Sequence, residues 1–219
     1  DPDHARQMLS AEMADRLAGQ IDPRRAGSRG PAAAEAVHRD TVYICVVDES
    51  RLAVSLIYST FWPFGSGLAS RRFGISLQNR GAGFSLVPGH VNELKGGRRP
   101  LHTLIPGFME QPGHYAMPFG VMGGQYQSVG QSAFLTNLLR LGMDPQAALD
   151  APRSFAYAGG LQMEETFSPE SYVALGQRGH LIERMNIGIG GGQAVIFDHA
   201  NGMLIGGSDP RKDGAAIGY

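Results

Sequence analysis

Hydrophobic and polar residues alternate along two neighbouring stretches in the first third of the chain. Residues 41–48 read Thr-Val-Tyr-Ile-Cys-Val-Val-Asp, and residues 52–59 read Leu-Ala-Val-Ser-Leu-Ile-Tyr-Ser. A period of two, with β-branched and aromatic residues, is typical of strands. The short polar link from Glu49 to Arg51 joins them, so the sequence predicts a β-hairpin.

The rest of the chain mixes both periodicities. Apolar spacing and end signals predict helices at 3–20, 128–141, 145–150 and 169–178 and strands at 74–78, 101–109, 115–121, 193–198 and 202–206. Asp144-Pro145 and Ser168-Pro169 each place a capping residue before a proline at the first helical position. Many strands with a few helices are typical of an α+β layered domain.

Two segments carry no periodicity. Residues 24–39 are rich in Gly, Arg and Ala and have few side chains that could pack, which predicts a mobile linker. Residues 79–98 are rich in glycine and form a long loop, a kind of segment that is usually functional in a compact domain.

Composition narrows the classes of protein that the chain can belong to. With 219 residues, 42% hydrophobic residues and a net charge of −1, it fits one soluble domain or two small ones. The charge does not favour nucleic acid or membrane partners. No apolar run reaches the ~18 residues of a membrane helix and no secretory signal is visible; the compartment stays open, with the cytoplasm favoured.

Metal and cofactor chemistry is not expected. Cys45 is the single cysteine, so neither an internal disulfide nor a CxxC-type metal site can form. The histidines do not cluster at ligand spacing, and the glycines at 188–192 precede a predicted strand without a lysine, which favours a turn over a phosphate site. We expect no metal and no cofactor.

Thr41 stands where the predicted linker meets the first strand. Cleavage of the Asp40–Thr41 bond would give this threonine a free α-amino group, whose pKa near ~8 suits a general base. A threonine with its own N-terminal amine is an established nucleophile. The alternative is that Thr41 is an ordinary strand residue.

Several sequence motifs decide between these two interpretations of Thr41. Besides 41–48, they are Ala53–Tyr58, Phe64–Gly67, Arg99–Thr103, Val121–Gly124 and Gly207–Arg211. In order and spacing they resemble the small subunit of the γ-glutamyltranspeptidase family, over about residues 41–219. That family consists of N-terminal-nucleophile hydrolases made as precursors that cut themselves before a threonine.

The resemblance implies a domain division, a fold and a partner. Residues 1–40 would be the tail of a large subunit with the processing linker, and 41–219 the small, catalytic subunit. The fold would be a four-layer αββα sandwich. It would be completed by a large subunit from the same precursor whose main body is absent from this chain.

The resemblance also assigns roles within the site. Thr41 would be the nucleophile. The backbone N–H groups of Gly123 and Gly124 would form the oxyanion hole. Ser59 lies where the family places a threonine that supports the nucleophile, and its hydroxyl keeps a hydrogen bond possible; the alternative is a solvent-facing strand serine.

Departures from the transpeptidase pattern bear on the substrate. The segment that grips the α-ammonium through acidic residues in γ-glutamyl enzymes reads Gln-Asn-Arg-Gly-Ala-Gly-Phe at 78–84. The usual serine pair is replaced by His102 and Thr103, and the asparagine two residues beyond Ser59 by Phe61. A guanidinium is suited to bind a carboxylate through two contacts. Arg80 therefore predicts carboxylate recognition, with Asn79, His102 and Thr103 as further substrate-binding candidates; alternatively Arg80 faces solvent or the missing subunit.

Together these features predict an autoprocessed amidohydrolase that acts on a small amide whose acyl part carries a second carboxylate, as in oxamate. The chain looks closest to members such as oxamate amidohydrolases and cephalosporin-acylase-like proteins. Two alternatives remain: γ-glutamyl hydrolysis or transfer, and an inactive homologue that never matures.

Overall fold

The computed structural model describes residues 2–27 and 40–219. Most of the linker predicted at 24–39 lies outside the described residues. The described chain forms two compact units, one from residues 2–27 and 154–186 and the other from 40–153 and 187–219. The predicted site residues all belong to the second unit.

The second unit contains the hairpin, a four-stranded sheet and two α-helices. The strands are β1 (Asp40–Val47), β2 (Ala53–Phe61), β3 (Gly107–Gln111), β4 (Tyr115–Met122), β8 (Gly191–Asp198) and β9 (Met203–Ser208). The helices are α3 (Tyr126–Leu139), α4 (Pro145–Asp150) and the short 3-10 helix η1 (Arg80–Gly83). β1 and β2 pair antiparallel, and the larger sheet has the antiparallel order β3-β4-β8-β9.

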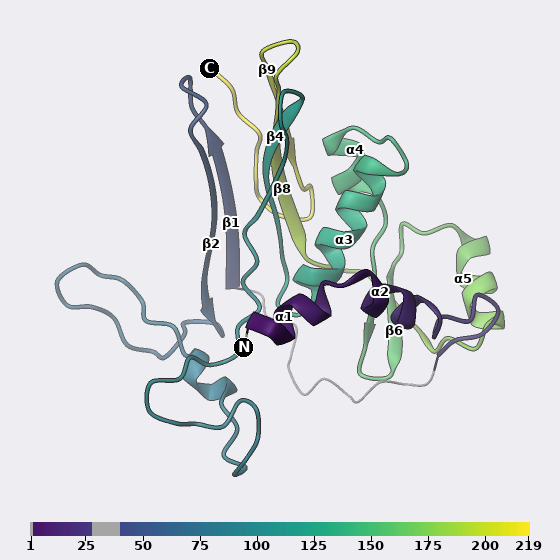
Figure 1. Cartoon of the computed structure of the whole chain (residues 1–219), viewed down its shortest axis with the longest axis horizontal. Helices are drawn as coiled ribbons and strands as arrows, with labels where there is room; N and C mark the ends of the chain where they lie inside the picture. The colour runs from purple at the N-terminus through teal and green to yellow at the C-terminus, as the bar shows by residue number, and fades with distance from the viewer. Residues whose placement is uncertain (1, 28–39) are drawn as a thin grey trace. The chain divides into compact units, whose positions relative to one another are not determined.

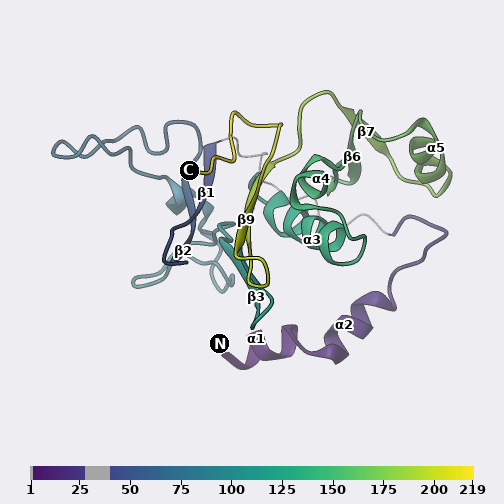
Figure 2. The ribbon, with the colours of Figure 1, turned by 90° about the horizontal axis from the view of Figure 1, so that it is seen from above.

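These elements form three layers. The β1–β2 hairpin packs on one face of the four-stranded sheet, against β4 and β8, and α3 and α4 pack on the sheet's other face. Figures 1 and 2 show the same order of hairpin, sheet and helices from two directions. The core between the sheet and the helices is built from Met117, Phe119, Phe134, Leu149 and Ala194.

The hairpin meets the sheet through the inward residues of its alternating pattern. Tyr43 is 3% exposed, and its ring lies so close to Gly120 that a side chain at Gly120 would overlap it at 2.5 Å. Glycine at position 120 is therefore needed for the two layers to approach. The tyrosine hydroxyl bonds the Ser55 hydroxyl at 2.8 Å, which in turn donates to the Gly107 carbonyl at 2.8 Å.

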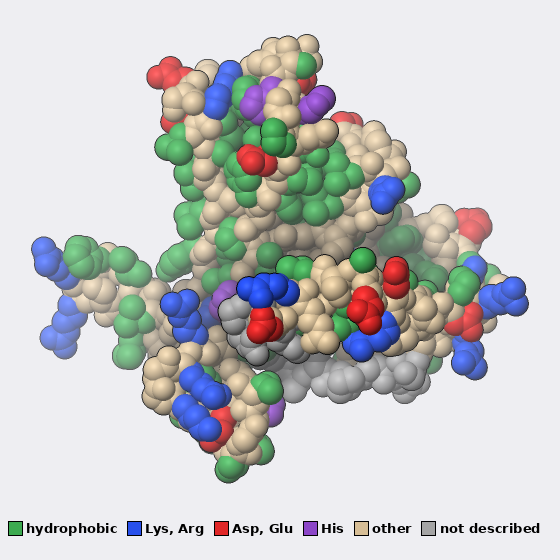
Figure 3. Space-filling model, in the orientation of Figure 1, with side chains coloured by type: hydrophobic (Ala, Val, Ile, Leu, Met, Phe, Trp, Pro, Cys, Tyr) green, Lys and Arg blue, Asp and Glu red, His purple; other side chains and the backbone are tan. Residues whose placement is uncertain are grey.

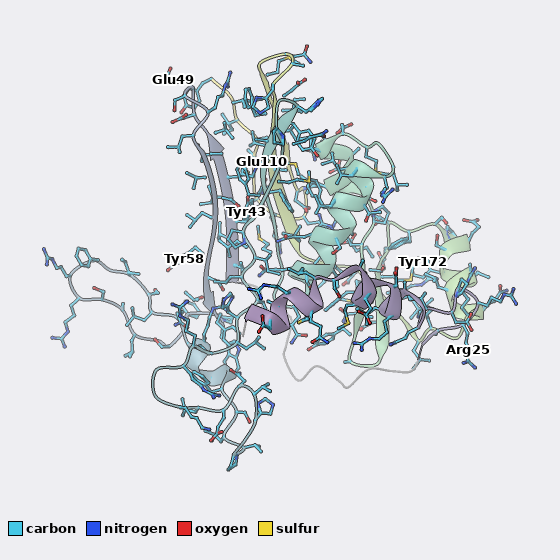
Figure 4. The ribbon with its side chains drawn as sticks, in the orientation of Figure 1. Arg25, Tyr43, Glu49, Tyr58, Glu110 and Tyr172 are labelled. Carbon is cyan, nitrogen blue, oxygen red and sulfur yellow. The ribbon has the colours of Figure 1, made fainter. Side chains whose placement is uncertain are left out.

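The outward face of the hairpin is apolar and exposed. The cross-strand pairs are Val42 with Tyr58, Ile44 with Leu56 and Val46 with Val54, and each of these side chains is about half exposed. Figure 4 shows Tyr43 between the hairpin and the sheet and Tyr58 on the opposite side of the hairpin. In Figure 3 hydrophobic side chains follow the left-hand edge of the upper part of the molecule, where the hairpin lies. This face has the composition of a buried surface rather than of a solvated one.

The first unit contains α1 (Pro2–Met8), α2 (Ala11–Ala18), β5 (Ser154–Tyr157), β6 (Gly160–Glu164), α5 (Pro169–Gln177) and β7 (Ile182–Met185). β5 and β6 form a hairpin, and β6 pairs with β7 in parallel through the α5 crossover. The Tyr172 hydroxyl of α5 donates to the Glu164 carbonyl at 2.6 Å. These three strands were not predicted from the sequence.

Several expected elements differ from the structure. The helix predicted at 3–20 is two helices, because the Ser10 side chain accepts a hydrogen bond from the Met13 N–H and begins a second helix. The strand predicted at 74–78 is reduced to one bridge between Ala69 and Ser76, and residues 101–106 are irregular, so β3 begins only at Gly107. The other predicted helices and strands are present: the helix predicted at 145–150 has these bounds, and the ends of the rest are shifted by one or two residues. Among the described residues, no helix is long and apolar enough to cross a membrane.

Candidate active site

Thr41 and Ser59 face each other across the start of the hairpin. They are register partners on β1 and β2, are 6% and 9% exposed, and the Thr41 hydroxyl donates to the Ser59 hydroxyl at 3.1 Å. Ser59 Oγ also accepts the Phe61 N–H at 3.0 Å. The hydrogen bond that the sequence allowed is therefore present, and Ser59 is not a solvent-facing serine.

Gly123 and Gly124 lie at the same end of the layers as Thr41. At the opposite end the Arg51 side chain, in the β1–β2 turn, donates to the Gly202 carbonyl in the β8–β9 turn at 3.0 Å. β4 starts opposite Asp198, close to that turn, and ends at Met122. The beginning of β1 and the end of β4 therefore lie together, away from these turns (Figure 1).

Both glycines have backbone conformations that favour glycine, with φ of 129° at Gly123 and 61° at Gly124. Their carbonyls accept the N–H groups of Tyr126 and Gln127 at 3.1 and 3.2 Å, which starts helix α3. The glycine pair thus stands at the positive end of a 14-residue helix. Such a place is suited to stabilise an oxygen that becomes negative.

Arg80 lies close to the Thr41–Ser59 pair. Its side chain is 7% exposed, and the guanidinium carbon is 5.0 Å from the centre of the Phe61 ring. Because Phe61 is hydrogen-bonded to Ser59, this cation–π contact places Arg80 beside the same end of the hairpin. The alternative that Arg80 faces solvent is wrong.

The other substrate-binding candidates are arranged differently. Asn79 fixes the loop after β2, because its Oδ1 accepts the Trp62 N–H at 3.1 Å and its own N–H donates to the Thr60 carbonyl at 3.1 Å. His102 is exposed and Thr103 half-buried in the irregular segment before β3. Within the described residues neither makes a side-chain hydrogen bond, so the structure does not join them directly to Thr41.

A buried ionic cluster, not anticipated from the sequence, fixes the backbone next to Gly123. Asp209 has no exposed surface and accepts the Gly192 N–H at 2.8 Å and the Arg211 N–H at 3.0 Å. It also pairs with the guanidinium groups of Arg153 and Arg211. The motif 207–211 supported the family resemblance, but a single sequence contains no signal that Asp209 would be the centre of this cluster.

Arg153 extends the cluster towards the glycine pair. Its guanidinium donates to the Ile189 carbonyl at 3.0 Å, which fixes the turn before β8. In this turn Gly190 is so close that a side chain on Gly123 would lie 3.0 Å from its Cα. The segment at 188–192, expected to be a flexible turn, is therefore held by buried charges.

Two further residues of β1, Tyr43 and Cys45, have shifted pKa values. Burial raises the pKa of Tyr43 above its ordinary value and raises the pKa of the Cys45 thiol to about 11. Both groups are therefore neutral at physiological pH. Among the described residues, no group of three or more His, Cys, Asp and Glu residues is placed to hold a metal ion.

Stacked sheets covered by helices, with a threonine at the start of an inner strand, define the fold of the N-terminal-nucleophile hydrolases. Solved structures support this class. The chain superposes on cephalosporin acylase from Bacillus halodurans with a TM-score of 0.83, at 38% identity, over 97% of this chain and 40% of that one. It shares the fold of γ-glutamyltranspeptidase from Pseudomonas nitroreducens, with a TM-score of 0.71 over 81% of this chain and 98% of that one, at 23% identity.

The sequence matches the γ-glutamyltranspeptidase family model over residues 1–219, and the chain belongs to that family. It is 36% identical to the oxamate amidohydrolase proenzyme of Klebsiella pneumoniae over all of this chain and 43% of that protein. It is 39% identical to the glutathione hydrolase-like YwrD proenzyme of Bacillus subtilis, over 86% of this chain and 37% of that protein. The chain thus spans less than half the length of these relatives.

Proposed function

We propose that this chain is the small-subunit portion, with its processing linker, of an amidohydrolase that matures by cutting its own Asp40–Thr41 bond. Residues 1–40 are then the end of the large subunit, and 41–219 the catalytic subunit. The observation that carries the proposal is the buried hydrogen bond between Thr41 and Ser59 at the end of the layers where Gly123 and Gly124 lie. The relatives named as proenzymes support it.

In the proposed reaction the free α-amino group of Thr41 takes the proton of the Thr41 hydroxyl as its oxygen attacks the amide carbonyl. The carbonyl oxygen becomes negative beside the N–H groups of Gly123 and Gly124. The carbon–nitrogen bond breaks, the amine leaves with the proton, and an ester with Thr41 remains. Water then attacks this ester, which releases the acid and restores the threonine.

The substrate that we propose is a small amide whose acyl part carries a second carboxylate, such as oxamate. Arg80 supports this, since its guanidinium is held over Phe61 next to Ser59. Acidic residues that could hold an α-ammonium are absent from the sequence 78–84. The name of the Klebsiella pneumoniae relative points the same way.

A second candidate is hydrolysis or transfer of γ-glutamyl groups, and the Bacillus subtilis relative is named as glutathione hydrolase-like. We further propose that the partner of this chain is the large subunit of the same precursor. The half-exposed apolar pairs on the outward face of the hairpin are consistent with a surface that another protein layer covers.

N-terminal sequencing and kinetics of the full-length protein test the proposal. We expect a new chain that begins Thr41-Val42-Tyr43, and hydrolysis of oxamate in preference to a γ-glutamyl anilide. Thr41→Ala should leave the precursor uncut and inactive. Normal cleavage of that variant would contradict the role of Thr41 as the nucleophile. An intact, inactive wild-type chain would favour the alternative that this protein is a homologue that does not mature.

A further inference from the structure

The irregular segment 101–105, which carries His102 and Thr103, is fixed at both ends by amide side chains. At one end, Asn92 Oδ1 accepts the Leu101 N–H at 3.2 Å, and its Nδ2 donates to the carbonyl of Gly83 in η1. At the other end, Gln127 and Gln131 bind the backbone of Ile105. The segment therefore connects η1, which begins at Arg80, with helix α3.

The glutamine pair forms a two-point clamp on one residue. Gln127 Oε1 accepts the Ile105 N–H at 3.1 Å, and Gln131 Nε2 donates to the Ile105 carbonyl. The two glutamines are four residues apart on α3, so they lie on the same face, and they are 0% and 8% exposed. The Gln127 backbone N–H donates to the Gly124 carbonyl at 3.2 Å. One residue thus contacts both the candidate oxyanion site and the segment 101–105.

The Gln127 side chain carries a structural cost. Its Nε2 is buried and has no hydrogen-bond partner among the described residues. An unpaired buried donor is costly, and an apolar side chain of similar shape would avoid that cost. The bond to Ile105 explains why an amide stands at this position, because its oxygen is needed to accept the Ile105 N–H.

We propose that Gln127 and Gln131 are positioning residues that set the substrate-binding segment relative to the oxyanion site and so determine which acyl group fits. This inference rests on the proposed function. On that function, Gly123 and Gly124 would hold the reacting carbonyl of the acyl group, and Arg80 together with the segment that carries His102 and Thr103 would hold its second carboxylate. The separation of these two places decides the length of acyl group that both can hold.

The clamp has a matched control in the same unit. Gln146 of α4 binds Ser208 in the same way, since its Oε1 accepts the Ser208 N–H at 3.0 Å and its Nε2 donates to the Ser208 carbonyl at 2.9 Å. It connects α4 to the end of β9, and none of its hydrogen bonds in the described part of the chain goes to segment 101–105. Loss of its bonds should therefore reproduce the structural cost without the change in substrate binding.

The test compares Gln127→Met, Gln131→Met and Gln146→Met in the full-length protein. Precursor cleavage, melting temperature, and kcat and KM for oxamate and for acetamide, which lacks the second carboxylate, are measured. For the first two variants we expect KM for oxamate to rise roughly tenfold, kcat to change less than about threefold and KM for acetamide to stay within about twofold. Gln146→Met should leave both KM values unchanged.

The outcomes separate this inference from the function on which it rests. A wild type that hydrolyses neither amide, nor a γ-glutamyl anilide, contradicts the proposed function. An active wild type whose Gln127 and Gln131 variants match Gln146→Met overturns the positioning role. If Gln127→Met does not fold, Gln131→Met decides; if neither gives folded protein while Gln146→Met does, the clamp is structural and the inference is wrong.

Discussion

Replacement of Ser59 by alanine tests the hydrogen bond on which the candidate site depends. The change removes the acceptor of the Thr41 hydroxyl, 3.1 Å away, and of the Phe61 N–H, 3.0 Å away. Because both Ser59 and Phe61 are buried, water does not readily replace the hydroxyl that the change removes. The expected loss of stability is about 1–3 kcal/mol.

The larger effect should be on turnover. Without Ser59 the Thr41 hydroxyl can rotate away from the attack direction, so we expect kcat to fall roughly ten- to a hundredfold, or about 1.4–2.7 kcal/mol. Steady-state kinetics on oxamate with the mature protein measure this. Ser59→Thr keeps the hydroxyl and should retain most of the activity.

Ser55→Ala is the matched control. Ser55 lies on the same strand, bonds the Tyr43 hydroxyl and the Gly107 carbonyl, both at 2.8 Å, and lies away from Thr41. The two alanine variants should lose similar stability in chemical denaturation, but only Ser59→Ala should lose turnover. Equal turnover in both variants would refute a supporting role for Ser59.

Three further predictions concern residues around the site. Arg80→Ala should raise KM for oxamate roughly ten- to a hundredfold and change KM for acetamide little, because a charged contact typically contributes about 1.5–3 kcal/mol; equal effects on both amides would contradict carboxylate recognition. Asp209→Asn removes the anion between Arg153 and Arg211, and should lower the free energy of unfolding by about 3–5 kcal/mol. Asp198→Asn, at a carboxylate that is only partly buried, is its control, and a loss as small as that of the control would contradict a stabilising role for the cluster. The pKa of Cys45 is raised to about 11, so at pH 8 roughly one thiol in a thousand is ionised. Alkylation of the folded protein by iodoacetamide should therefore be slow at pH 8 and accelerate up to about pH 11, and rapid labelling at pH 8 would contradict a raised pKa for this thiol.

Local patterns determined the elements whose signals lie within a few residues. The alternation at 41–48 and 52–59 predicted the hairpin, because the side-chain period of a strand is independent of what it packs against. Asp144-Pro145 and Ser168-Pro169 predicted two helix starts, since a cap acts within one turn, and both caps accept the expected backbone N–H. The order of motifs was sufficient for the family. The role of Thr41 remains a prediction.

Tertiary structure decided the features that depend on residues far apart in the chain. Strands β5 to β7 are short, and β6 finds its partner β7 only through the α5 crossover, so their sequences carry no distinct period. Arg80 was compatible with solvent exposure until the fold placed it over Phe61. The clamp of Gln127 and Gln131 on Ile105, and the contacts of Asp209 with Arg153, join positions more than twenty residues apart. A single sequence specifies which groups can form hydrogen bonds and ion pairs; only the packing of the layers brings the partners within reach and removes the water that would otherwise compete for them.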